Sequence, residues 1–108
     1  MTLAKQALDA VEATFVVDAH GRIEDVDDSA CALLGYSRDQ LRGLHGSHLV
    51  PRAARPATAA SLDRMRRGEI DFRQGTLRCR NGAVLRVEVR ARTLNEGRLA
   101  LCVRRAPG

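Results

Sequence analysis

The chain has 108 residues, 44% of them hydrophobic and 29% charged, which are ordinary proportions for a single globular domain. No apolar run reaches about 18 residues and no signal-peptide pattern is present, so the sequence predicts no membrane-spanning helix. The formal net charge of +5 is carried by arginine, because Lys5 is the only lysine. Cys31, Cys79 and Cys102 match neither a disulfide framework nor a zinc motif, so we expect buried thiols in a reducing, cytoplasmic setting.

A helix and a β-hairpin are predicted at the start of the chain. Leu8 and Val11 share one face at helical spacing, which indicates a short amphipathic helix over residues 3–13. The β-branched run over residues 14–18 and the alternating run over residues 22–27 are typical of strands. The Ala-His-Gly stretch between them is typical of a turn.

Two short helices are predicted to meet at Gly35. Asp27 and Asp28 both precede the first helix and are candidate N-caps. Gly35 stands where a helix ends in the left-handed conformation. Ser37 and Gln40 have the spacing of a capping box, which begins the second helix directly after the glycine. The bend is therefore a specified joint between two capped helices.

The second half changes from helical to two-fold periodicity. Pro56 can open a helix over residues 57–67, whose apolar stripe is thin. Asn81-Gly82 is a two-residue hairpin signal. Three strands are predicted, over residues 70–80, 83–93 and 98–105. In the middle strand Leu85, Val87, Val89 and Ala91 alternate with Arg86, Glu88, Arg90 and Arg92. This pattern predicts an α+β fold with one antiparallel sheet that helices cover on one face.

The stretch VDDSACALLGYSRDQLRGLHGSHLVP, residues 26–51, resembles the signature of the PAS domain family. In that family a strand leads to a Gly-Tyr corner, then to a short helix ending in Leu-x-Gly and to a Leu-Val-Pro stretch. LRCRNGAVLRVEVRA and GRLALCVRR resemble its last strands, and the likeness covers residues 10–105. It implies a five-stranded antiparallel sheet in the order 2-1-5-4-3 with short helices forming a cup. Residues 1–13 would be a flanking helix, residues 14–105 the domain and residues 106–108 a tail.

The resemblance implies a non-enzymatic sensory or protein-interaction module of a bacterial signalling protein, as in two-component systems. Such a module dimerises and sometimes holds a small ligand in the cup. The expected lining is wholly apolar and consists of Leu33, Leu49, Leu62, Met65, Leu77, Val87, Val89 and Leu101. It suits an apolar ligand such as a fatty acid better than a charged metabolite. The alternative is a filled core, which would make the chain a ligand-free dimerisation or docking domain.

The sequence predicts no cofactor and no metal. Haem-binding members of the family commonly use a histidine on the long helix, and residues 57–67 contain none. Photoactive flavin members need a cysteine after the Leu-x-Gly segment, and residues 44–50 contain none. His45 and His48 are three residues apart, but a pair without a third ligand is a poor metal site.

Two surfaces are candidates for partners. The apolar face with Leu8 and Val11 needs a cover, and the outer sheet face would carry Arg86, Arg90 and Arg92. We expect a homodimer through these surfaces and a downstream or separate signalling domain as the partner. Docking of an acidic partner is the alternative for the arginines. Nucleic acid is disfavoured because interleaved aromatics and a basic helix are missing, and an enzyme because no catalytic constellation is recognisable.

Overall fold

The computed structural model describes residues 12–107, so the predicted helix face with Leu8 and Val11 lies outside the described residues. The strands are β1 (Ala13–Val17), β2 (Ile23–Val26), β3 (Phe72–Arg78), β4 (Val84–Thr93) and β5 (Leu99–Arg105). The α-helices are α2 (Asp28–Leu34), α3 (Arg38–Leu41) and α4 (Arg55–Arg66). Short 3-10 helices form η1 (Gly46–Leu49), η2 (Arg52–Ala54) and η3 (Asn95–Gly97).

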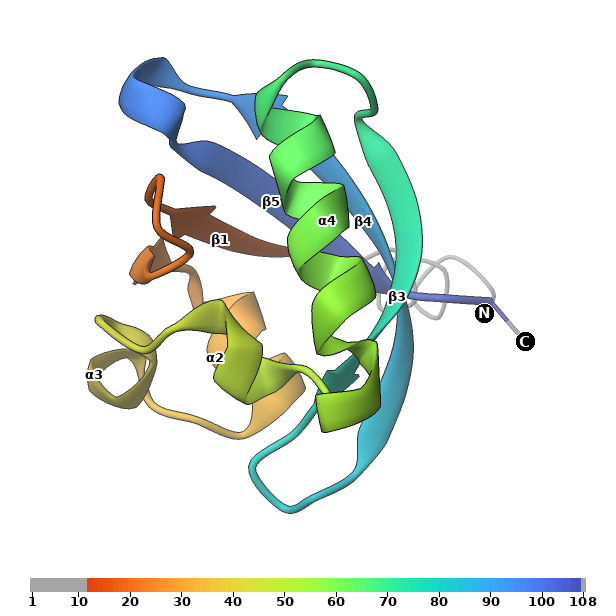
Figure 1. The fold of residues 1–108 in the computed structure, drawn as a ribbon. Helices are drawn as coiled ribbons and strands as arrows, with labels where there is room; N and C mark the ends of the chain where they lie inside the picture. Colours follow the sequence, from red (N-terminus) through yellow and green to blue (C-terminus); the bar gives the residue numbers. More distant parts are fainter. Residues whose placement is uncertain (1–11, 108) are drawn as a thin grey trace, which may run out of the picture.

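The five strands form one sheet in the order β2-β1-β5-β4-β3 (Figure 1). Every neighbouring pair is antiparallel, and β5, the last strand, lies between β1 and β4. The short helices and α4 lie on one side of this sheet. The predicted α+β fold and its strand order are therefore confirmed.

The register of the strands decides which side chains face the helices. Phe15 of β1 and Ala91 of β4 both lie opposite Leu101 of β5, so all three share the inner, helix-covered face. On the outer face, Glu88 accepts a hydrogen bond from Arg104 Nε at 2.9 Å. The alternation predicted for β4 is confirmed, because the four apolar side chains of the pattern pack on the core and Arg86, Arg90 and Arg92 are exposed.

The turn between β3 and β4 differs from the predicted two-residue loop. Cys79 N–H donates to Ala83 O at 2.7 Å, which leaves residues 80–82 as a three-residue loop. Its glycine has φ 92°, the left-handed conformation that such a loop needs at its last position. The extra residue shifts the strand register by one place, so Leu77 lies opposite Leu85 and both pack on the core.

Asp27, rather than Asp28, caps the first short helix. Its Oδ1 accepts hydrogen bonds from Ala30 N at 2.8 Å and from Thr14 N at 3.1 Å. One carboxylate thus joins the start of α2 to β1. Asp28 is the first residue of α2, and its exposed side chain forms an ion pair with Arg38 at 3.0 Å.

The predicted joint at Gly35 is confirmed. Gly35 ends α2 with φ 80° and ψ 17°, and its N–H donates to the carbonyl four residues earlier at 2.8 Å. Ser37 and Gln40 form both hydrogen bonds of the capping box that begins α3. Leu34 and Leu41, on either side of the joint, are both 0% exposed. Because such short helices are unstable alone, burial of these two leucines holds them in place.

The core lies between the inner sheet face and the helices. α4 crosses that face over β3 and β4, whereas α2 packs on β1 (Figure 1). Among the described residues, α4 contributes one fully buried side chain, Met65, while Leu62 is half-buried. The predicted thin apolar stripe of α4 therefore leaves the space beneath this helix only partly filled.

Arg66 ties the end of α4 to two hairpin turns. Its side chain is 17% exposed. It donates from Nη2 to Asp18 O at 2.9 Å, in the β1–β2 turn, and from Nε to Gly97 O at 3.1 Å, in η3. These bonds hold the end of α4 against the two turns, which lie at the same end of the strands.

Candidate functional site

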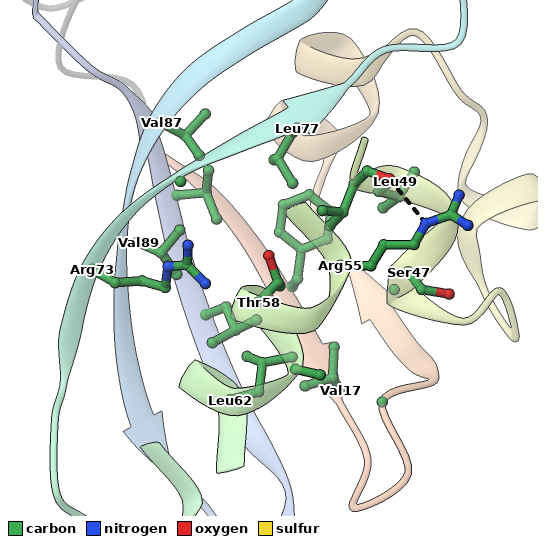
Figure 2. A pocket seen from close by; sticks show the side chains of 18 of the residues that line it. Val17, Ser47, Leu49, Arg55, Thr58, Leu62, Arg73, Leu77, Val87 and Val89 are labelled. Carbon is green, nitrogen blue, oxygen red and sulfur yellow. Dashed lines mark hydrogen bonds between the residues drawn. The ribbon is translucent and has the colours of Figure 1, made fainter. Parts of the chain in front are cut away.

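A cavity of about 140 Å³ lies between α4, η1 and the inner face of the sheet (Figure 2). The structure brings together seven of the eight residues expected to line a ligand pocket. They are Leu49, Leu62, Met65, Leu77, Val87, Val89 and Leu101. Phe15, Val17 and Ile23, which the sequence analysis did not select, add to the apolar lining.

Leu33 does not line the cavity. It is half-buried and packs against the core, whereas its neighbour Leu34 is fully buried. A helix turns by about 100° per residue, so two adjacent leucines cannot both point at the same space. α2 also packs on β1 rather than over the cavity, which lies under α4.

The size of the cavity limits what it can hold. An apolar cavity of about 150 Å³ in another protein binds benzene. Pockets for drug-sized ligands are roughly 300–1,000 Å³. The cavity therefore matches a group about as large as one aromatic ring.

The wall of the cavity also contains polar groups that the sequence analysis missed. They come from η1, α4 and β3, and are Ser47, Arg55, Thr58 and Arg73. Thr76 also borders the cavity, but it lies opposite Arg86 of the outer face. The hydroxyl of Thr58 donates to Ala54 O at 2.8 Å, so its hydrogen is already used at the start of α4. Arg55 donates from Nε to Val50 O at 3.2 Å, and Figure 2 shows its guanidinium on the side of Thr58 away from Arg73.

Arg73 lies on the inner face of the sheet. It is directly opposite Val89, an inward-facing residue of β4. Its guanidinium lies over Gly75, where a β-carbon would be 3.4 Å from Nη2. Nε donates to Gln74 O at 2.9 Å and Nη1 to Ala57 O at 3.3 Å, so the group bridges β3 and α4. The signal for this placement was the two-fold spacing from Leu77, because residues 73, 75 and 77 of a strand share one face.

Of the two histidines considered as metal ligands, His45 lines the cavity and His48 does not. Ser47 N donates to His45 Nδ1 at 3.2 Å, and His45 Nε2 lies 2.9 Å from His20 O. Both ring nitrogens of His45 thus have protein partners, while His48 is exposed. Within residues 12–107 no cluster of three or more His, Cys, Asp or Glu side chains could hold a metal ion.

The same residues contain no helix long and apolar enough to cross a membrane.

Comparison with known proteins identifies the family. Residues 9–105 match the family model described as PAS fold. A domain of the sensory box sensor histidine kinase/response regulator from Geobacter sulfurreducens is 33% identical, with a TM-score of 0.78 and coverage of 95% of this chain and 92% of that one.

More distant structures share the fold. The PAS domain of the RpfR quorum-sensing receptor from Cronobacter turicensis, in complex with C12:0, is 15% identical with a TM-score of 0.78, over 91% of this chain and 96% of that one. The PAS domain of an HTR-like protein from Haloarcula marismortui is 24% identical with a TM-score of 0.69, over 98% of this chain and 100% of that one. The curated proteins contain no match. The matched family model, which spans almost the whole described chain, shows that this chain belongs to the PAS family.

Proposed function

We propose that this PAS domain is a non-catalytic sensory module of a bacterial signalling protein and that it binds a small apolar ligand beneath α4. The observation that carries the proposal is the cavity of about 140 Å³, most of whose lining is aliphatic. The family and the likeness to a sensor histidine kinase domain support the sensory role. A downstream or separate signalling domain would receive the signal.

A ligand in this cavity would contact several helices and strands at the same time. The lining comes from α4 and η1 on one side and from β1, β3, β4 and β5 on the other. An occupant would therefore contact both layers of the domain and stabilise their present packing. A ligand that binds only the folded domain adds about 2.7 kcal/mol of stability at a hundred times its Kd.

The size of the cavity selects among apolar ligands. The Cronobacter turicensis relative is a complex with C12:0, a molecule with twice as many carbons as benzene. Benzene already suits a cavity of the size found here. A ligand of about six to eight carbons therefore fits this chain better than a long fatty acid.

The test is binding of benzene and toluene, measured by the thermal unfolding midpoint and by ligand NMR. We expect a saturable rise in the midpoint with the natural chain. Val89→Phe places a ring in the cavity, because Val89 lines it (Figure 2), and should abolish the rise while the variant remains folded. No rise with the natural chain, or an equal rise with Val89→Phe, would overturn the proposal.

A second role, docking through the outer sheet face, is favoured by the exposed Arg86, Arg90 and Arg92. In a two-fold homodimer this face would meet its own positive charge, which opposes association at low salt. We therefore expect any homodimer through this face to tighten as salt rises, whereas an acidic partner would bind less tightly. Sedimentation at low and high salt measures the first effect, and a monomer at every concentration would exclude the homodimer.

A further inference from the structure

We propose that the ligand carries a carboxylate which Arg73 binds, on an apolar body about the size of one aromatic ring. This inference rests on the proposed function, because it names the chemical class of the ligand for the same cavity. The starting observation is a guanidinium on an otherwise mainly aliphatic wall. This guanidinium is half-buried, and an arginine is well suited to bind a carboxylate.

Arg73 has unused hydrogen-bonding capacity. An arginine has five N–H donors and remains charged in proteins. Two of them donate to the carbonyls of Gln74 and Ala57. None of the ion pairs among residues 12–107 includes Arg73. The remaining donors are therefore free to bind an anion that enters the cavity.

The guanidinium is also held in place before any ligand binds. The two carbonyls anchor it to β3 and to α4, and it lies flat over Gly75, which has no side chain to displace it. A fixed fork of donors matches the two oxygens of a carboxylate, and the entropy lost on binding is small. The half-buried guanidinium borders apolar side chains, which include Val87 and Val89, so its attraction for a carboxylate is stronger there than on a fully exposed surface.

The other cation of the wall is less suited to this task. Arg55 donates from Nε to Val50 O, and its guanidinium points away from the part of the cavity that Arg73 faces (Figure 2). The carboxylate is therefore assigned to Arg73, with the apolar body of the ligand against Leu62, Leu77 and Val89.

A different explanation for an inward arginine is protection of the sheet edge. β3 is one of the two edge strands, and inward-pointing charges discourage edge-to-edge pairing of sheets. That explanation predicts that removing Arg73 promotes aggregation and leaves the selectivity of the cavity unchanged. The two explanations therefore differ in a measurable binding preference.

The test compares benzoate with benzyl alcohol, which has a similar shape and no charge, by calorimetry and by ligand NMR. We expect benzoate to bind the natural chain at least about tenfold more tightly. In Arg73→Gln that preference should disappear, with the affinity for benzyl alcohol unchanged, and Arg73→Lys should retain only part of it. Arg90→Gln removes the same charge from the outer face and should leave both affinities as they are.

The outcomes separate the two proposals. Equal affinity of the natural chain for both probes, or benzoate binding to Arg73→Gln at the natural level, overturns the carboxylate inference and leaves the apolar cavity intact. Failure of both probes and of benzene to bind overturns the proposed function and this inference together. Binding of benzyl alcohol to Arg73→Gln also shows that the variant keeps its fold.

Discussion

Asp27 is the residue whose replacement tests most directly how the helical cup is attached to the sheet. Its carboxylate accepts one hydrogen bond from Ala30 N, at the start of α2, and one from Thr14 N, in β1. Asp27→Ala removes both acceptors. Loss of an N-cap costs about 1 kcal/mol, and loss of a hydrogen bond to a charged group costs about 1.5 kcal/mol. We therefore expect the free energy of unfolding to fall by about 2–3 kcal/mol.

This loss is large for a domain of 108 residues, whose total stability is of the order of 5–15 kcal/mol. It corresponds to a fall in Tm of roughly 10–20 °C. Urea unfolding followed by far-UV circular dichroism is the appropriate measurement, because the chain contains no tryptophan. The m-value should stay constant, since the folded state buries the same surface.

Two further variants make the test specific. Asp27→Asn keeps an oxygen acceptor and should lose less than about 1 kcal/mol, because Asn and Asp are comparable N-caps. Asp28→Ala removes the neighbouring exposed carboxylate, which only pairs with Arg38, and should leave the urea midpoint unchanged. The reasoning is refuted if Asp27→Ala unfolds at the natural midpoint, or if Asp28→Ala is equally destabilised.

Three other predictions concern burial, pH and anchoring. Leu34→Ala should cost about 3–5 kcal/mol in urea unfolding, and Leu33→Ala clearly less, because only Leu34 is fully buried; equal losses would contradict this. A hydrogen bond from the backbone N–H of Arg22, and a second from that of His20, hold the pKa of Asp18 below its ordinary value of 3.8. The folded state is therefore stabilised above that value and loses this contribution as pH falls toward the lowered pKa, so Asp18→Asn should show a shallower acid-side fall in urea midpoint. Arg66→Ala should lower Tm by several degrees, because two carbonyl contacts are lost, whereas the exposed Arg64→Ala should not; equal Tm values would disprove the anchoring role.

The architecture could be predicted from the sequence because several local signals agree with one another. Gly35, with the capping box of Ser37 and Gln40, defines the joint between two helices. The strict alternation along β4 assigns one face of the sheet to the core. When local preferences agree with the overall fold in this way, the fold can be predicted from the sequence.

The cavity wall could be predicted only in part. The apolar residues of β4 and β5 could be predicted from their two-fold pattern, and Leu77 of β3 was also placed correctly. The same spacing puts residues 73 and 75 on the inner face, but a charged residue and a glycine give no apolar signal there. The structure accordingly has Phe72 42% exposed and Arg73 facing the core, the reverse of what hydrophobicity alone predicts. The prediction that Leu33 lines the cavity was wrong because helical spacing shows which residues share a face of α2, but not which way that face points.

Several residues that are unfavourable for folding stability lie together on one wall of the cavity. Gly75 weakens the strand in which it stands, because it adds backbone entropy and no packing. Arg73 brings a charge to the inner face, where an aliphatic residue would fill the space and cost less. On the opposite side, α4 contributes the half-buried Leu62, which does not fill the cavity. Stability alone would favour larger apolar residues at each of these places. Since local rules are typically broken where a binding function requires it, these features support the proposal that a ligand binds at the wall between β3 and α4.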